Sequence, residues 1–416
     1  MLSRVYAGFS KTEISPSIGS ELCGYGMYLE RCAESILTPL MTRSIVVSDG
    51  FNKICIISCD LIGLDYEYVV KLQSELSKII EIPVGNIMIS CTHIHAGPAT
   101  CYTLDGCLGR QDKNYMNSLF TKILKTAEAA NKNIMPAKIG FAAKNISGIG
   151  YNRVLNSDLL KEDVLVLRID IEDQRKLAII NYACHPVSLG VTRKISADFP
   201  GYLIQKILNE NGISGFFLQG FAGDINPSNI RGGNHYDLEN NETACRQFGS
   251  KLADAVVEVY KNIDCCNRAK ISVTNTTKKI KLQIFSEQEV INSRCLGGER
   301  FHQIWQKKAI ERLSERCCFF KVPIQIIKIG QLVISALPGE VFHEFGTKIR
   351  KVYQHVLTAG YSGGNIGYIP DTSSYKNENN YAAYLAPRFY PTVFPLAPDA
   401  GEILTEEIIT LIKNMN

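Results

Sequence analysis

The chain has 416 residues, 45% of them hydrophobic and 21% charged, a composition typical of globular proteins that excludes a disordered chain. At this length we expect either two lobes or one large layered domain. The net charge is only +4 and no long run of like charges occurs, which argues against a protein that binds nucleic acid or a membrane surface through its charge.

The N-terminus, MLSRVYAGFSKTEISP, lacks the apolar segment of a secretory signal, and no later segment has the apolar length of a membrane-spanning helix. The 14 cysteines include no CxxC pair and no regular spacing. We therefore expect reduced thiols rather than a disulfide framework or a cysteine zinc site. These patterns together predict a cytoplasmic protein without membrane insertion.

In the N-terminal part, apolar β-branched segments alternate with amphipathic segments. The apolar segments predict buried strands at residues 44–50, 53–64, 86–95, 138–146, 163–171, 177–186 and 215–224. The amphipathic segments predict helices at 67–80, 117–130, 199–211 and 244–262. This alternation indicates an α/β protein with mixed β-sheets flanked by helices.

The pattern changes after about Ile263. The C-terminal part predicts an edge strand, a helix, a hairpin of two strands and a final helix, at residues 270–285, 293–313, 322–340 and 402–415. We therefore divide the chain into an N-terminal α/β lobe, 1–265, and a C-terminal α/β lobe, 266–416. No repeat and no flexible linker separates them, so the lobes should pack as one unit.

Candidate metal ligands follow three of the predicted strands. His93 and His95 lie in THIHAGP, and because residues two apart on a strand point to one face, we expect them to project together. His185 ends another strand, and Glu340 follows a third in LPGE. Each residue alone could be a packed histidine or a charge that starts a helix. Together, two histidines and a carboxylate form a common catalytic zinc set.

Two aspartates belong near this centre by the order of the motifs. Asp60 in SCDLIG and Asp198 in SADFPG could each orient a ligand histidine through its free ring nitrogen. Capping of the following helix is an equally good interpretation. The remaining histidines, His235, His302 and His343, have no motif context, and we expect them to be surface or packing residues.

A GxSxG match at residues 360–364 (GYSGG) has the form of a nucleophile elbow. The α/β-hydrolase order requires a histidine after that serine, and the last histidine of this chain is His355. We therefore do not expect a serine nucleophile at Ser362.

The motifs of the whole chain, in their order, resemble those of the neutral non-lysosomal ceramidases and their shorter bacterial relatives. The matching strings are AGFSKTEISP, CGYG, IISCDLIG, THIHAGP, YNR, NYACHPVS, ISADFPG, LQGFAGDINP, ALPGE and GGNIGYIPDTSSYKNENNY. One such string would be weak evidence, but their shared order is strong. The resemblance implies a ceramidase-type catalytic domain with Zn²⁺ as its cofactor.

The resemblance also implies individual ligands. Zinc would be bound by the first histidine of HxH, the histidine of the HP strand end, the glutamate of PGE and a later tyrosine. In this sequence those residues are His93, His185, Glu340 and Tyr368.

Roles in the reaction follow from the same resemblance. His95 would exchange protons with the attacking water or the leaving amine. Arg153, in YNR, would stabilise negative charge on the carbonyl oxygen. Tyr381, whose spacing differs slightly from that of the family, would assist there.

Two departures from the family pattern change the expected function. Ceramidases carry a serine in GDxSP, whereas this chain has Asp224 and Asn226 around Ile225, so metal-activated water rather than serine would attack. We expect Asp224 and Asn226 to support the site. Ceramidases also continue into an immunoglobulin-like C-terminal domain, which we do not expect here.

We therefore expect a zinc-dependent amidohydrolase that cleaves a linear amide bond in a soluble, N-acylated small molecule. A zinc-dependent esterase or lactonase is left open, because the same centre attacks either carbonyl. A ceramide or N-acyl-lipid amidase is also open. A binding protein that has lost turnover is less favoured, because the ligand set is intact.

Overall fold

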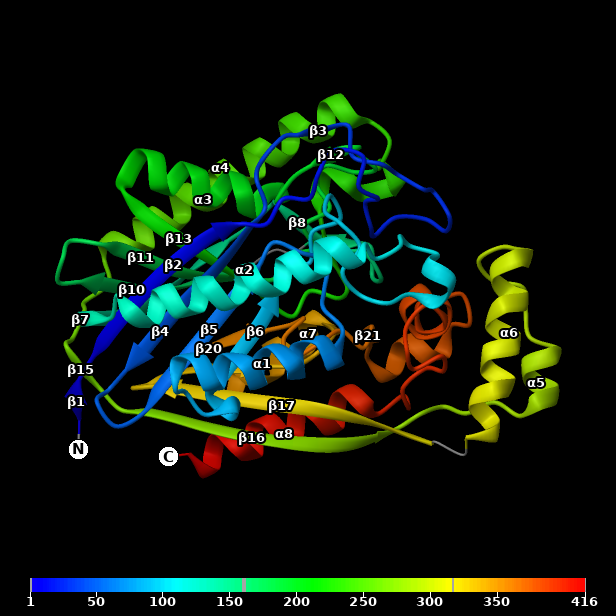
Figure 1. The fold of residues 1–416 in the computed structure, drawn as a ribbon. Helices are drawn as coiled ribbons and strands as arrows, with labels where there is room; N and C mark the ends of the chain where they lie inside the picture. Colours follow the sequence, from blue (N-terminus) through cyan, green and yellow to red (C-terminus); the bar gives the residue numbers. More distant parts are fainter. Residues whose placement is uncertain (1, 159–161, 316–317, 416) are drawn as a thin grey trace.

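The structure is a computed structural model that describes residues 2–158, 162–315 and 318–415. Two β-sheets lie face to face, and helices cover the outer face of each, giving four layers (Figure 1). The predicted α/β class with mixed sheets flanked by helices is confirmed.

The larger sheet has eight strands in the order β13-β11-β10-β7-β2-β4-β5-β6. Only the outermost pairs, β11 with β13 and β5 with β6, are parallel. Its strands, in chain order, are β2 (Tyr6–Glu13), β4 (Met41–Ser48), β5 (Lys53–Cys59), β6 (Ile87–Cys91), β7 (Met135–Ile146), β10 (Glu162–Ile171), β11 (Lys176–Tyr182) and β13 (Ile213–Gln219).

The smaller sheet has four strands in the order β16-β17-β18-β20, so the expected edge strand and the expected hairpin are both present. Its strands are β16 (Ile271–Lys281), β17 (Phe319–Ile329), β18 (Leu332–Ala336) and β20 (Val356–Ala359). The long β16 and β17 run below the larger sheet in Figure 1, and α8 packs against them.

Both faces of the larger sheet are buried, which explains why its strands read as continuous apolar runs rather than as alternating ones. In β4, Val46 faces the helices, whereas Ile45 and Val47 face the smaller sheet. The core between the sheets takes side chains from both of them, for example Ile56 and Ile334. The division at 265 and 266 into two lobes stays a prediction.

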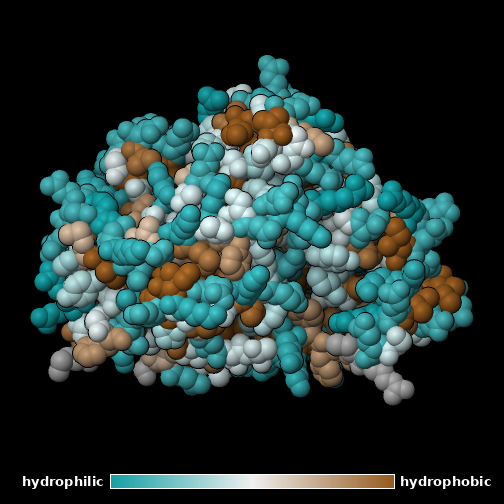
Figure 2. Space-filling view, viewed as in Figure 1, coloured by the Kyte–Doolittle hydropathy of each residue, from teal (hydrophilic) through white to brown (hydrophobic). Residues whose placement is uncertain are grey.

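Helices α1 (Tyr66–Ile80), α2 (Lys113–Lys132), α3 (Asp198–Asn211) and α4 (Leu238–Lys261) cover the larger sheet. Helices α7 (His343–Val352) and α8 (Ala400–Asn414) cover the smaller one. Helix α6 (Glu299–Ser314) and the short α5 (Glu287–Ile291) pack together beyond the end of this sheet (Figure 1). None of the helices in the described ranges combines the length and hydropathy needed to span a bilayer. On the face shown in Figure 2, hydrophobic residues form small separate groups among hydrophilic ones.

Short strands connect the loops beyond the two main sheets. These are β1 (Ser3–Arg4) with β15 (Arg268–Ala269), β3 (Ser35–Ile36) with β12 (Lys194–Ile195), β8 (Gly150–Asn152) with β9 (Ser157–Asp158) and β14 (Ile225–Pro227), and β19 (Glu340–Val341) with β21 (Tyr368–Ile369). The last two groups carry residues of the candidate site. Short 3-10 or π turns lie at Val84–Asn86, Leu104–Gly106, Ser228–Gly233, Thr372–Lys376, Tyr381–Leu385 and Ala386–Arg388.

Eight cysteines are buried and have free thiols, namely Cys23, Cys55, Cys59, Cys91, Cys101, Cys107, Cys184 and Cys245.

Candidate metal centre

His93 is held rigidly just beyond β6. Its backbone N–H donates to Leu61 O (2.8 Å), and its ring Nδ1 donates to Ile62 O (2.7 Å). The side chain is only 2% exposed. Because a neutral imidazole that donates from Nδ1 has an unprotonated Nε2, this nitrogen is left as an acceptor or a metal ligand.

His185 is held in the same way beyond β11. Its Nδ1 donates to Ala222 O (2.6 Å), and its backbone N–H donates to Ile225 O (2.9 Å). The side chain is fully buried, and this burial lowers the pKa of His185 to about 4. The ring is therefore neutral near pH 7, with its Nε2 lone pair pointing away from the carbonyls.

Glu340 lies at the start of β19, and its carboxylate contacts the Nε2 atoms of both His93 and His185. Its Oε2 lies 3.3 Å from His93 Nε2 and 3.1 Å from His185 Nε2. Three acceptor atoms thus face one another in a buried space, an arrangement that a shared cation would satisfy.

His95 completes this cluster. Its Nε2 lies 3.2 Å from His93 Nε2, and the ligand atoms of the three histidines lie within 4.8 Å of one another. Its Nδ1 is buried and has no hydrogen-bond partner among the described residues. Imidazole nitrogens with a carboxylate oxygen are the donor set that zinc prefers, so these residues fit a zinc ion.

Tyr368 reaches the centre from β21, which pairs in parallel with β19 so that Tyr368 lies opposite Glu340. Its hydroxyl accepts a 2.6 Å hydrogen bond from Arg153, which also donates to Gly223 O (2.8 Å). Burial raises the pKa of Tyr368 well above its ordinary value, while Arg153 opposes that shift. The ring of Tyr381 packs edge-on against Tyr368 with centroids 5.7 Å apart.

Asp224 ties the segment that carries Arg153 to the segment that follows Glu340. Its carboxylate accepts from Asn152 Nδ2 (2.5 Å) and from the backbone N–H of His343 (2.7 Å), and its carbonyl accepts from Arg153 N (2.8 Å). Asn226 lies next to it in β14, opposite Tyr151 of β8. The side-chain oxygen of Asn226 is buried without a partner among the described residues.

Residues 6–302, well over half of the chain, match the family described as neutral/alkaline non-lysosomal ceramidase, N-terminal. The chain belongs to this family.

Two kinds of relative agree with this assignment. The neutral ceramidase of Pseudomonas aeruginosa is 26% identical over 370 residues, covering 70% of this chain but only 55% of the relative. The chain thus spans about half the length of that curated protein. The crystal structure of neutral ceramidase from P. aeruginosa superposes with a TM-score of 0.75 at 16% identity, over 98% of this chain and 74% of the other. A structure described as ceramidase complexed with C2 gives 0.77 at the same identity and coverage.

The geometry of this ceramidase-family chain corrects the expectation for Asp60. Its carboxylate pairs with Arg43 (2.8 Å) and accepts from Met41 N (2.9 Å). The Nδ1 atom of His93, which Asp60 was expected to orient, is instead bound to the carbonyl oxygen of Ile62. A backbone carbonyl positions the ring more rigidly than a side chain does, and no sequence pattern marks it.

Asp198 is corrected in the same way. Its carboxylate accepts from the backbone N–H groups of Ser188 (3.2 Å), Leu189 (3.0 Å) and Phe199 (2.7 Å). It therefore fixes the loop that follows His185 rather than the imidazole itself.

The two histidines of HxH converge for a different reason from the one expected. Strand β6 ends at Cys91, and His93 has a left-handed backbone with φ 65°. Alternation along a strand therefore does not apply at this position. The turn itself brings the rings of His93 and His95 to a centroid distance of 4.9 Å.

Two tyrosines that the motifs did not single out also contact the cluster. The Tyr361 ring stacks on His93 with centroids 4.0 Å apart, and its hydroxyl lies 3.5 Å from His185 Nε2. The Tyr390 hydroxyl donates a 2.5 Å hydrogen bond to Glu340 Oε1. Neither tyrosine stands in a recognisable metal-ligand spacing, so only the folded chain reveals them.

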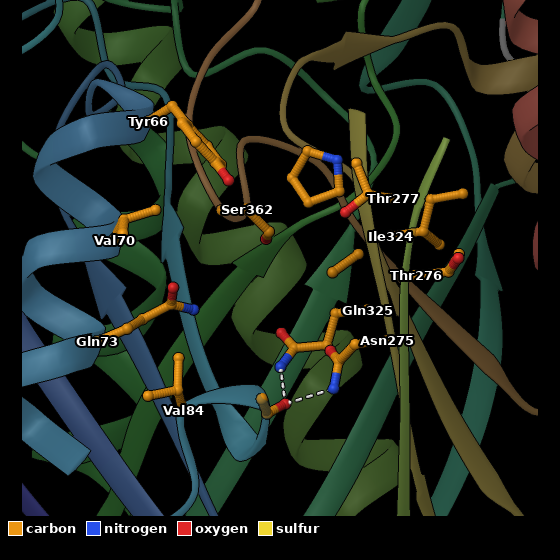
Figure 3. Close-up of a pocket in the computed structure, with 14 residues that line it drawn as sticks. Tyr66, Val70, Gln73, Val84, Asn275, Thr276, Thr277, Ile324, Gln325 and Ser362 are labelled. Carbon is orange, nitrogen blue, oxygen red and sulfur yellow. Dashed lines mark hydrogen bonds between the residues drawn. The ribbon is translucent and has the colours of Figure 1, made fainter. Parts of the chain in front are cut away.

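Ser362 of the GxSxG match lies outside the centre. Its hydroxyl donates to Gly360 O (3.1 Å), and it lines a separate cavity of about 250 Å³ together with Tyr66, Gln73, Asn275 and Gln325 (Figure 3). No histidine is among the described residues that line this cavity. A nucleophilic role for Ser362 therefore has no base to support it.

Proposed function

We propose that this chain is a zinc-dependent amidohydrolase that cleaves the linear amide bond of an N-acylated small molecule. The observation that carries the proposal is the convergence of His93 Nε2 and His185 Nε2 on Glu340 Oε2, at 3.3 and 3.1 Å in a buried site. Zinc would be held by His93, His185 and Glu340, with Tyr368 beside them. A zinc ion bound there would supply Lewis acidity and activate water towards a carbonyl carbon.

The chain's own residues supply the remaining groups. His95 has its Nε2 3.2 Å from His93 Nε2 and would receive the proton of the attacking water and deliver it to the leaving amine. Arg153, whose guanidinium donates to the Tyr368 hydroxyl, would present positive charge to a carbonyl oxygen that becomes negative. Tyr381 is 44% exposed and its ring packs edge-on against Tyr368, and it would assist Arg153 at the carbonyl.

The substrate class follows from this chemistry and from the relatives. The P. aeruginosa relative is named for ceramide, which is an N-acyl amide. We propose the same scissile bond here, in a soluble N-acylated amine, with ceramide-like lipids as the second candidate. The eight buried free thiols suit a reducing compartment and support a cytoplasmic location.

The test begins with the metal content of purified protein, followed by hydrolysis of a panel of N-acyl amines with short and long chains, ceramide and matched esters. We expect zinc to be bound and amide cleavage to stop with chelator and return with zinc. His93→Ala should abolish both zinc binding and turnover, whereas His355→Ala, which alters an exposed histidine, should change neither. Protein that neither contains zinc nor takes it up would refute the proposal. Faster cleavage of the esters than of the matched amides would show that the enzyme is an esterase.

A further inference from the structure

Glu340 uses its two carboxylate oxygens differently. Oε2 faces His93 and His185, whereas Oε1 accepts the hydroxyl hydrogen of Tyr390 at 2.5 Å. A distance this short is typical of a hydroxyl that donates to an ionised carboxylate.

The Tyr390 ring is fixed by its surroundings. It is 7% exposed and belongs to the core beneath the smaller sheet. Gly367, with φ 86°, leaves room for it, because a Cβ at Gly367 would lie 2.3 Å from Tyr390 Cδ2. The carbonyl of Gly367 in turn accepts from the backbone N–H of Glu340 (2.9 Å). Glu340, Gly367 and Tyr390 therefore form one packed unit.

We propose that Tyr390 is a positioning residue for the metal centre. By occupying Oε1 of Glu340, it fixes the rotation of the carboxylate and leaves Oε2 as the oxygen that is free to bind a cation. This inference rests on the proposed function, since it assumes that Glu340 is a metal ligand.

If Tyr390 has this role, removal of its hydroxyl should change metal binding as well as packing. Without the hydroxyl, Oε1 is released, and the carboxylate can rotate or offer both oxygens. Groups that hydrogen-bond to metal ligands commonly contribute about 10- to 100-fold in metal affinity. A merely structural tyrosine would change stability and leave metal affinity as it was.

The experiment compares three full-length proteins stripped of metal: wild type, Tyr390→Phe and Tyr115→Phe. Tyr115, in α2, is the control, because its part-buried hydroxyl likewise donates one hydrogen bond, to the backbone carbonyl Ile14 O (2.7 Å). Zinc affinity is measured by competition with a chromophoric chelator, and the Co²⁺ form is examined by its visible absorption. The melting temperature of each apo protein reports folding.

We expect Tyr390→Phe to melt like Tyr115→Phe as apo protein, yet to bind zinc about 10- to 100-fold more weakly and to show an altered Co²⁺ spectrum. Wild-type affinity together with an unchanged spectrum in Tyr390→Phe would overturn the role of Tyr390 while leaving the proposed function intact. Absence of metal binding in the wild type would overturn the proposed function, and this role with it.

Discussion

Glu340 and Tyr368 are direct partners in the parallel pair of β19 and β21, so a carboxylate and a phenol approach the histidine cluster from neighbouring strands. The short strands come from segments that lie on either side of α7 and β20 in the sequence. Their pairing also helps to position Arg153, because the guanidinium of Arg153 donates to the Tyr368 hydroxyl. Glu340, Tyr368 and Arg153 are therefore held together as one unit.

The first prediction concerns Arg153. Arg153→Met removes the positive charge beside Tyr368 but none of the contacts among the three histidines. We expect kcat to fall by about 10²- to 10³-fold, as for the loss of one oxyanion donor, with bound zinc unchanged. Steady-state kinetics and metal analysis of the same sample measure both. Arg246→Met, at an exposed arginine, is the control, and zinc lost in parallel with activity would assign Arg153 to metal binding instead.

The second prediction tests the cluster of acceptors. Glu340→Gln replaces one of three facing acceptors with an amide whose N–H can donate to His185 Nε2 or His93 Nε2. We expect the apo variant to be at least as stable as apo wild type, because the acceptor repulsion is relieved. Zinc at 100 times its Kd should raise wild-type stability by about 2.7 kcal/mol and that of the variant by much less.

Thermal melts with chelator and with added zinc provide the measurement. A Glu340→Gln variant that zinc stabilises as strongly as wild type would show that Glu340 is not a ligand.

The sequence predicted most strands and helices of this fold because their signal lies in local patterns. Buried strands such as β4 and β5 read as apolar runs, and amphipathic helices such as α4 have a clear period. Strand β2 was not predicted as such, since Tyr6–Glu13 mixes polar and apolar residues along its length. Its place in the sheet is set by its pairing with β4 and β7.

At the centre, residue types were predictable but their connections were not. His93, His185 and Glu340 were recognisable by motif, and the structure brings their side chains together. The atoms that orient them are backbone carbonyls, of Ile62 and Ala222, which any residue could supply. Of the two interpretations given for Asp60 and Asp198, orientation of a ligand histidine is therefore not the one that the hydrogen bonds support.

The third prediction uses two glycines with similar backbones. A Cβ at Gly24 (φ 107°) would lie 2.6 Å from the ring of His95, whereas a Cβ at Gly19 (φ 89°) meets open space. Each alanine substitution should cost about 1–2 kcal/mol from the left-handed backbone alone. Only Gly24→Ala should also displace His95, and a displacement of about 1 Å can lower turnover by about 10²-fold.

Denaturant unfolding and kcat on the same preparations separate the two effects. Equal turnover in Gly24→Ala and Gly19→Ala would mean that the position of the His95 ring does not limit the reaction.

The last prediction concerns pH and the ion pair behind the centre. His343 Nε2 lies 2.5 Å from Glu162 Oε2, and Arg350 lies 3.4 Å from the other oxygen of that carboxylate. Burial alone would lower the pKa of His343, but attraction and hydrogen bonding to Glu162, aided by Asp224, raise it above its usual 6.5. Because the folded-state pKa is the higher one, the pair stabilises the protein fully below about pH 6.5, and this contribution is lost as pH rises through the folded-state pKa.

His343→Gln keeps a hydrogen-bond donor beside Glu162 but cannot take up a proton. With chelator present to exclude metal effects, the stability difference between wild type and this variant should be largest near about pH 6 and shrink towards about pH 9. Chemical unfolding across that range measures it, with His355→Gln as the exposed control. A difference that stays constant with pH would mean that His343 is not protonated in the folded protein. Its contribution to the segment that follows Glu340 would then come from packing and from the backbone hydrogen bond to Asp224.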